Sequence, residues 1–341
     1  MKRRFLIVPI LFLLAGPVLW TAEFTDGRVK LVLHEATGRF SLYYFSEGVN
    51  ARFEPFFVDQ DPRTSSLSVM VDGKVYRMGE SSAFKIRAGK DSPSLIFESA
   101  FLRVTEDFSF IKTAGSSQTN GVVLSIRAEN KNSRQSDVGV RLLIDTMLGE
   151  AGGDTHFLTD QRSLSSETII ESTEKDRFWI SRNDGLSLMG SLYGTGSDPS
   201  LVHFANWKRF NDVPWKLEYM AGRNYTYLPY SIKDSAVSYY FDPRSLGSGE
   251  TLTLAVSLAA EDPQGFARPS PAKNLARFLQ GIVNMPAPGE ISSSSLQADM
   301  KLIQDLIGEM EKNEEQASSL SSEEFAAIEL IINRLKARYG L

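Results

Sequence analysis

The chain has 341 residues, no cysteine and a formal net charge of −5. Without cysteine it can form no disulfide, no thiolate metal site, no cysteine nucleophile and no lipid-modified N-terminal cysteine. Its length and its 42% of hydrophobic residues suffice for a large buried core, and its acidic balance argues against nucleic acid and anionic lipid as main partners.

The first 22 residues have the layout of a secretory signal peptide. A basic head, Lys2 to Arg4, precedes an apolar run from Phe5 to Trp20, and the small pair Thr21-Ala22 follows. We therefore expect an exported protein, periplasmic or extracellular, with a mature net charge of −8, because the head contributes +3 to the total of −5. The alternative is a retained membrane anchor, although the run carries two prolines and is shorter than the roughly 20 apolar residues of a spanning helix. If the segment is cleaved, we expect no stable membrane span.

Between residues 23 and 262 the pattern predicts β-structure throughout. Short apolar runs end at turn residues, and Asp72-Gly73 separates two such runs as a type I′ hairpin turn does. Predicted strands cover residues 29–33, 40–45, 67–71, 74–77, 83–88, 94–105, 122–130, 138–146, 178–182, 186–193, 236–241 and 251–259. No helices suited to parallel crossovers separate them, so we predict a mainly β fold, a large antiparallel β-sandwich.

The sequence pattern of residues 263–341 predicts a helical C-terminal region. Ser270 can cap a first helix, a second begins near Ser294, and Ser321 with Glu324 forms a capping box for a third. The last two are expected to form an antiparallel helical hairpin. Because such a hairpin is marginal alone in water, its apolar stripe must be buried. We expect this stripe to pack on the first helix or on the sandwich. The alternative is that residues 290–341 dock a partner or a second copy of the chain.

One group of polar side chains follows the predicted strand 138–146. Asp145, Glu150, Asp154 and His156 lie within twelve positions in a glycine-rich stretch. Carboxylate oxygens can bind Ca²⁺, and a carboxylate with an imidazole can supply a general acid and a general base. The alternative is a structural turn in which Asp145 accepts backbone N–H groups. The spacing assigns neither a definite metal-ligand set nor a catalytic residue.

Aromatic residues are concentrated between residues 179 and 230. Trp207, Trp215 and Tyr227 are interleaved with polar residues, so they are suited to stacking on sugar rings; the alternative is that they fill the core. We expect residues 197–229 to form a long loop region over one sheet face, where binding sites are common. The polar stretch around Glu167 is expected to be a solvated loop or a strand edge.

Several segments resemble a pattern found in exported bacterial β-sandwich proteins of uncharacterised activity. These are 138–149, with the pattern V-G-x-R-x-x-x-D-T-x-x-G and its extension to residue 154, then 204–207, 239–243, Leu246 and 249–251. The match also resembles the supersandwich class, which includes galactose mutarotase-like and carbohydrate-active domains, and it covers roughly residues 24–260. It implies the fold of a large β-sandwich. Mutarotases rely on a pair of histidines and a glutamate, whereas the histidines of this chain are His34, His156 and His203.

The sequence favours a non-enzymatic protein. It contains no phosphate loop before a helix, no H-E-x-x-H motif and no G-x-S-x-G motif. We predict a binding or structural protein that engages another envelope macromolecule, a protein or a glycan, through its sandwich face or its helical tail. The alternative is a carbohydrate-binding or carbohydrate-modifying domain. In it the three aromatic residues form a platform, and Asp145, Glu150 and Asp154 form its polar or Ca²⁺-binding part.

Overall fold

The structure is a computed structural model that describes residues 21–47, 51–57, 63–89, 92–146, 148–150, 156–171, 176–193 and 198–266. The chain divides into two units, Met1–Ala267 and Arg268–Leu341, and every described residue belongs to the first. The three predicted C-terminal helices and the apolar run at residues 5–20 lie outside the described residues. Within the ranges above, no helix has the length and apolar composition needed to cross a membrane.

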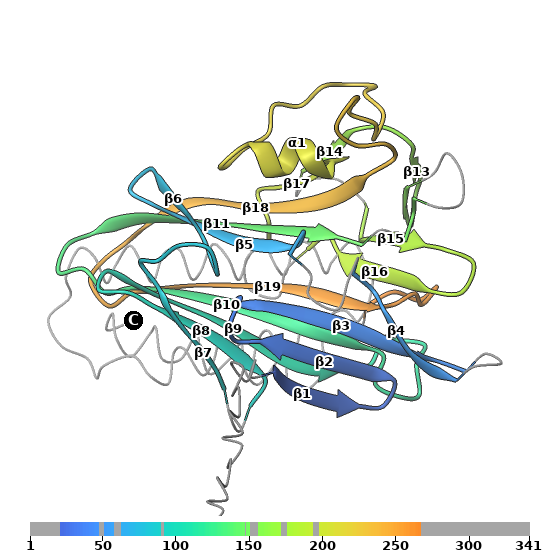
Figure 1. The fold of residues 1–341 in the computed structure, drawn as a ribbon, viewed down its shortest axis with the longest axis horizontal. Coiled ribbons are helices and arrows are strands. Elements are labelled where there is room, and N and C mark those ends of the chain that lie inside the picture. Colours follow the sequence, from blue (N-terminus) through green and yellow to red (C-terminus); the bar gives the residue numbers. More distant parts are fainter. Residues whose placement is uncertain are drawn as a thin grey trace, which may run out of the picture. The chain divides into compact units, whose positions relative to one another are not determined.

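The described residues form three antiparallel sheets and one short helix, α1 (Trp207–Asp212), which Figure 1 shows. The four-stranded sheet has the order β1 (Thr21–Asp26), β2 (Val29–His34), β3 (Arg39–Ser46), β4 (Arg52–Pro55). The six-stranded sheet has the order β14 (Thr168–Ile170), β17 (Leu201–Asn206), β18 (Ser235–Leu246), β11 (Ser136–Asp145), β5 (Ser66–Val71), β6 (Lys74–Arg77). The nine-stranded sheet has the order β13 (Ser163–Leu164), β12 (Phe157–Thr159), β15 (Phe178–Arg182), β16 (Ser187–Ser191), β19 (Thr251–Ala260), β10 (Gly121–Asn130), β9 (Leu102–Ile111), β8 (Ser94–Glu98), β7 (Lys85–Ala88). The predicted mainly β, antiparallel architecture is confirmed.

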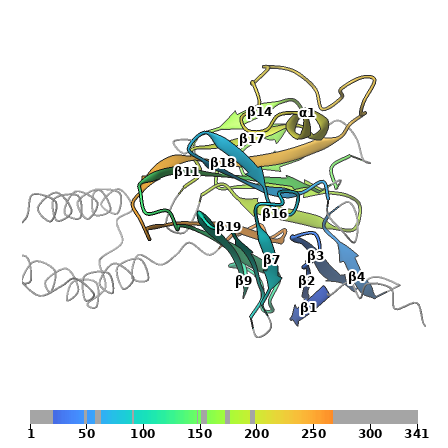
Figure 2. The same cartoon turned by 60° about the vertical axis from the view of Figure 1, so that its left-hand side comes forward.

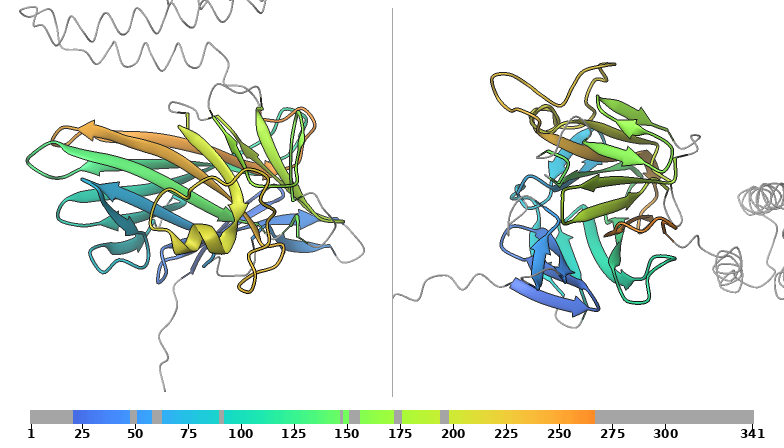
Figure 3. Two further views of the ribbon diagram at one scale, coloured as in Figure 1. Left: turned by 90° about the horizontal axis from the view of Figure 1, so that it is seen from above. Right: turned by 90° about the vertical axis from the view of Figure 1, so that its right-hand side faces the viewer.

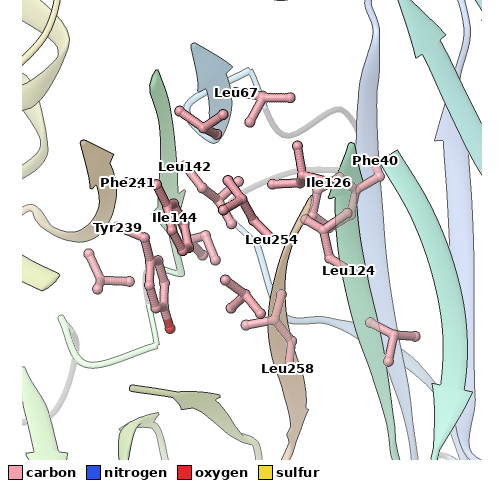
Figure 4. Close-up of a cluster of buried hydrophobic side chains, with 14 of the residues drawn as sticks. Phe40, Leu67, Leu124, Ile126, Leu142, Ile144, Tyr239, Phe241, Leu254 and Leu258 are labelled. Carbon is pink, nitrogen blue, oxygen red and sulfur yellow. The ribbon is translucent and has the colours of Figure 1, made fainter. Parts of the chain in front are cut away.

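The main core lies between the six-stranded and the nine-stranded sheets, which Figure 1 and Figure 3 show one above the other. Alternate residues of the facing strands point inward (Figure 4). They include Leu142 and Ile144 of β11, Tyr239 and Phe241 of β18, Leu124 and Ile126 of β10, and Leu254 and Leu258 of β19. Each such burial contributes about 1.5–3 kcal/mol, so this core stabilises the sandwich without any disulfide.

Turn residues determine where the strands begin and end. Asp72 and Gly73 have φ values of 49° and 81°, as a type I′ turn requires, and they join β5 to β6 as predicted. The prediction of one strand over residues 94–105 is wrong, because β8 and β9 form a hairpin there. Ser99 causes the turn: its Oγ accepts the N–H of Leu102 at 2.9 Å, and its own N–H donates to the Leu102 carbonyl at 3.0 Å.

The prediction of a long loop over residues 197–229 is wrong in its first half, where the chain forms β17 and α1. The side chain of Asn206 caps α1 by accepting the N–H of Arg209 at 3.2 Å. At the other end, the buried guanidinium of Arg141 donates to the carbonyls of Phe210 at 3.0 Å and Val213 at 3.1 Å. Polar side chains therefore stabilise a six-residue helix that is too short to show a helical period.

Candidate functional site

Three carboxylates from separate parts of the chain meet at one end of the six-stranded sheet. Asp145 is the last residue of β11 and pairs with Ala236 of β18, Asp234 lies directly before β18, and Glu150 follows β11. One oxygen from each carboxylate lies within 4.8 Å of one oxygen of the other two. We call Asp145, Glu150 and Asp234 the carboxylate cluster. The antiparallel register assembles it, because this register joins the end of β11 to the start of β18.

Hydrogen bonds hold the carboxylate of Glu150 and the backbone of Asp145 in place. The N–H of Ser235 donates to Oε1 of Glu150 at 2.9 Å. The N–H of Asp145 donates to Oγ of Ser65, directly before β5, at 3.0 Å. Asp145 is buried, whereas Glu150 is half-buried, so the cluster extends from the interior toward solvent.

The electrostatics of the cluster favour a protonated glutamate. Burial raises the pKa of Glu150 to about 7, and the negative charge of Asp234 adds to this effect; the N–H of Ser235 stabilises the ionised form and opposes it. Burial also raises the pKa of Asp234. Near pH 7 both forms of Glu150 are therefore populated, so one site can donate and accept a proton.

His156 lies beside the cluster and is connected to it through Ser235. Nδ1 of the buried His156 ring lies 2.9 Å from Oγ of Ser235, and the ring centroid lies 4.4 Å from that of Tyr225. Of the predicted site residues, Asp145, Glu150 and His156 thus come together. Asp154 lies outside the described residues. Asp234 completes the cluster, and sequence reasoning missed it because no local spacing relates it to Asp145.

The three aromatic residues predicted as a platform are half-buried and have separate neighbours. The backbone N–H of Trp207 donates to the carbonyl of Asp234 at 3.1 Å, and its indole Nε1–H donates to the carbonyl of Thr64 at 2.8 Å. Trp207 therefore belongs to the support of the carboxylate cluster. The other ring neighbours are Tyr240 for Trp215, at 6.2 Å, and Tyr230 for Tyr227, at 5.3 Å.

A second polar group lies between β17 and α1, and we call Glu167, His203 and Arg209 the Glu167 network. Glu167 Oε1 lies 3.0 Å from His203 Nε2 and accepts the N–H of Met220 at 3.0 Å, while Oε2 accepts from Arg209 Nη1. Burial raises the pKa of Glu167, but the hydrogen bonds and the charge of Arg209 outweigh it and hold that pKa below its usual value. The prediction of a solvated loop at Glu167 is wrong, because the side chain is buried. The alternative of a strand edge fits its position directly before β14, the edge strand of the six-stranded sheet. The partners of Glu167, His203 and Arg209, lie 36 and 42 positions away, so no local pattern reveals them.

The outer face of the nine-stranded sheet carries a polar groove of about 440 Å³. Three arginines line it, and all three are paired. Arg127 Nη2 lies 2.7 Å from Asp107 Oδ2 and Arg103 Nε lies 2.9 Å from Glu98 Oε2. Arg87 Nη2 lies 3.6 Å from the same oxygen of Glu98. Because these charges balance each other, the groove offers hydrogen bonds to a polar ligand rather than a site for a free anion.

No family model and no curated protein matches this chain. Similar solved structures include a galactose mutarotase related enzyme from Lactobacillus acidophilus, with 10% identity, a TM-score of 0.43 and coverage of 72% of this chain and 98% of that one. A galactose mutarotase-like protein from Lactobacillus casei ATCC 334 has 11% identity, a TM-score of 0.43 and coverage of 71% and 100%. A third, from Clostridium acetobutylicum, has 11% identity, a TM-score of 0.36 and coverage of 72% and 99%. The predicted resemblance to the galactose mutarotase-like class is confirmed as a likeness of fold.

The comparison also corrects the predicted function. The similar structures are galactose mutarotase-like proteins, one of them named as an enzyme, and none of these three is named as a binding protein of the cell envelope. The hypothesis of a non-enzymatic protein that engages an envelope macromolecule is contradicted by this comparison. What the chain does chemically depends on its own side chains.

Proposed function

We propose that the β-sandwich is a carbohydrate-modifying domain whose acid and base are residues of the carboxylate cluster. One observation carries the proposal: Glu150, with a pKa raised to about 7, lies within 4.8 Å of two other carboxylates. Bond changes at an anomeric carbon require a proton given to a ring or glycosidic oxygen and a proton taken from a hydroxyl or a water. A protonated carboxyl beside an ionised one meets both requirements.

The environments of the carboxylates suggest their roles. Glu150 is half-buried and holds a proton near pH 7, so it is the proton donor. Asp234 is also half-buried and is a stronger base than an ordinary aspartate once it ionises, so it is the acceptor. Asp145 is buried and forms the inner wall of the site. His156 acts as a positioning residue, because it contacts the same Ser235 whose N–H binds Glu150.

The predicted export segment limits the substrates. Outside the cytoplasm no nucleotide-activated sugar is expected, so the substrate in this proposal is a free aldose or a glycan of the envelope. Trp207 lies next to the cluster: its backbone N–H donates to the carbonyl of Asp234 and its indole donates to the carbonyl of Thr64, so it supports the site.

Ca²⁺ binding is a second candidate function for the same side chains. Ca²⁺ takes six to eight oxygen ligands at about 2.3–2.6 Å, and three carboxylates with oxygens within 4.8 Å of each other can supply part of such a set. A bound cation would remove the proton from Glu150, so the two functions predict opposite protonation states.

The experiment uses the full chain and follows anomer interconversion of free aldoses, and release of reducing ends from glycans, by proton NMR. Glu150→Gln keeps the shape and removes the titrating proton, so the rate is expected to fall by about 100-fold or more. Glu23→Gln, at an exposed position of β1 that lines neither the cluster nor the groove, is the matched control and keeps the unchanged rate. No turnover of any sugar, or equal rates for Glu150→Gln and the unchanged chain, contradicts the enzymatic proposal.

Calorimetric titration with CaCl₂ separates the second candidate from the first. If the cluster is a cation site, binding is stronger at pH 8 than at pH 6, because protons compete for Glu150, and it is lost in Glu150→Gln. Ca²⁺ binding without turnover would assign a Ca²⁺ role to the cluster and overturn the acid–base role. Absence of Ca²⁺ binding at both pH values contradicts the cation site.

A further inference from the structure

Large exposed apolar side chains gather in one segment, the connection from α1 to β18. Within the part of the chain that the structure describes, they are Tyr219, Met220, Leu228, Tyr230 and Ile232. Leu228, Tyr230 and Ile232 are 69%, 65% and 71% exposed, and we call these three the apolar tip. A contiguous apolar group on the surface of a soluble domain commonly marks an interaction site.

The apolar tip sits at the end of a hairpin-like fold of residues 225–234. The N–H of Tyr227 donates to the carbonyl of Ser231 at 2.9 Å, and the N–H of Asp234 donates to the carbonyl of Tyr225 at 3.1 Å. Figure 1 and Figure 2 show this connection projecting from the outer side of the six-stranded sheet, beside α1. The apolar side chains therefore occupy a convex protrusion rather than a groove.

Buried polar groups hold the base of this protrusion. Nδ2 of Asn206 donates to the carbonyls of Tyr225 at 2.8 Å and Asp234 at 2.9 Å and to Oγ of Ser231 at 2.9 Å. The Glu167 network holds the preceding turn through the N–H of Met220. Because these hydrogen bonds fix the base of the protrusion, the fold itself holds the tip in its exposed position.

Cations surround the tip. Nζ of Lys208 lies 5.7 Å from the ring centroid of Tyr230, Cζ of Arg223 lies 5.2 Å from that of Tyr227, and the exposed Lys233 follows Ile232. The acids facing this surface are Asp212, which pairs with Lys208, the exposed Glu218 and the half-buried Asp234. With the exposed Lys216, the surface of α1 and this connection carries four basic side chains against three acidic ones, a net charge of +1, whereas the chain as a whole has a net charge of −5. The tip thus combines aliphatic and aromatic groups with a slight excess of cations.

We propose that the apolar tip inserts into the interface of a lipid bilayer with anionic headgroups. A convex tip of aliphatic side chains suits the acyl boundary, the tyrosine ring suits the headgroup level, and lysine and arginine attract anionic lipid. The expectation that anionic lipid is not a main partner rested on the charge of the whole chain, whereas the surface around the tip has a slight excess of cations. The contact would bring the six-stranded sheet and its carboxylate cluster to a membrane surface, and it does not depend on the proposed enzymatic activity.

The absence of cysteine permits a test at one chosen position. Leu228→Cys in the full chain is labelled with an environment-sensitive dye and mixed with phosphatidylcholine vesicles, with or without phosphatidylglycerol. Emission is expected to shift to the blue only with phosphatidylglycerol. Thr253→Cys, exposed on the outer face of the nine-stranded sheet, is the control and shows no shift. No shift at Leu228→Cys contradicts the proposal, and so does an equal shift at both positions. A shift that grows with protein concentration in the absence of vesicles also contradicts it, because it indicates contact with a second copy of the chain.

A second measurement addresses the predicted apolar run at residues 5–20, which could itself bind vesicles and is identical in all variants. The double variant Leu228→Ser, Ile232→Ser is expected to lower the partition coefficient onto phosphatidylglycerol vesicles by about tenfold or more, because it removes the inserted aliphatic groups. Lys233→Gln is expected to lower it by about fivefold, with no effect on phosphatidylcholine vesicles. Equal partitioning of the double variant and the unchanged chain contradicts insertion of the tip.

Discussion

The carboxylate cluster and the Glu167 network use the same kinds of residue near the same sheet, yet their glutamates behave in opposite ways. Glu167 is almost completely buried and its pKa is lowered, whereas Glu150 is only half-buried and its pKa is raised to about 7. Burial alone would predict the reverse order. The difference comes from the neighbours: Glu167 has a guanidinium and an imidazole, and Glu150 has further carboxylates.

Glu106 on β9 follows the same rule. It is buried in the sandwich, and burial raises its pKa to about 8, although the charge of Arg39 opposes this shift. A buried carboxyl that lacks both a close cation and several hydrogen-bond donors, such as Glu106, has a raised pKa. Asp262 has a lowered pKa without a cation, because the Thr113 hydroxyl and two backbone N–H groups donate to it. The Glu167 network is therefore internally neutralised and serves stability, while the carboxylate cluster retains groups that can exchange protons.

Removing the cation of the Glu167 network is expected to give the largest effect. Arg209→Met leaves the Glu167 carboxylate buried without its guanidinium, so the free energy of unfolding falls by about 3–5 kcal/mol. Urea denaturation measures this change. Arg127→Met removes the exposed pair with Asp107 and is the control, with an expected loss of about 0–1 kcal/mol. A loss of similar size in both variants would mean that the network contributes no more than a surface ion pair.

The comparison also explains how much of the site could be predicted from the sequence. Asp145 and Glu150 were found because they follow one strand, and His156 because it lies in the same stretch. Asp234 lies 89 positions after Asp145 and joins the cluster only because β11 and β18 are neighbours in the sheet. The partners of Glu167 were missed for the same reason, since pairing between distant strands leaves no local spacing.

The fold was easier to predict, with instructive exceptions. Short apolar runs that end at turn residues identified β5, β10 and β11, and most side chains of these strands are buried. The hairpin between β8 and β9 was missed because its turn depends on Ser99 rather than on glycine or proline. Helix α1 was missed because Asn206 and Arg141 stabilise its ends from outside the helix. Where polar side chains make the structure, the hydrophobic pattern does not report it.

Removing the titrating group of the carboxylate cluster is expected to raise the free energy of unfolding, whereas Arg209→Met lowers it. The folded-state pKa of Glu150, about 7, lies above its ordinary value of 4.5, so as the pH rises through this window the unfolded chain ionises first and the folded chain loses stability. Glu150→Gln escapes this loss. At pH 8 this variant is expected to be more stable than the unchanged chain by about 1–2 kcal/mol, because solvent around the half-buried Glu150 screens part of the effect. At pH 4 the two chains are expected to be equally stable.

Urea denaturation at both pH values checks this prediction, with Glu23→Gln as the control that shows no such pH dependence. Together with the expected loss of turnover, a gain of stability in Glu150→Gln would show that this glutamate is kept for chemistry at a cost to folding. If Glu150→Gln is instead less stable than the unchanged chain at pH 8, Glu150 stabilises the fold, as Glu167 does.

The smallest expected effect concerns the support of the carboxylate cluster. Trp207→Phe keeps an apolar ring and removes the indole donor to the carbonyl of Thr64, so the free energy of unfolding is expected to fall by about 0.5–1.5 kcal/mol. Thr64 precedes Ser65, whose Oγ holds the backbone of Asp145, so the same change loosens one wall of the site without touching the Glu167 network. Urea denaturation gives the loss of stability, and the NMR assay gives the turnover. If turnover falls by no more than a few-fold, Trp207 is a support; if it falls as far as in Glu150→Gln while stability changes little, the indole must contact the sugar directly, and the platform role predicted for this residue regains its basis.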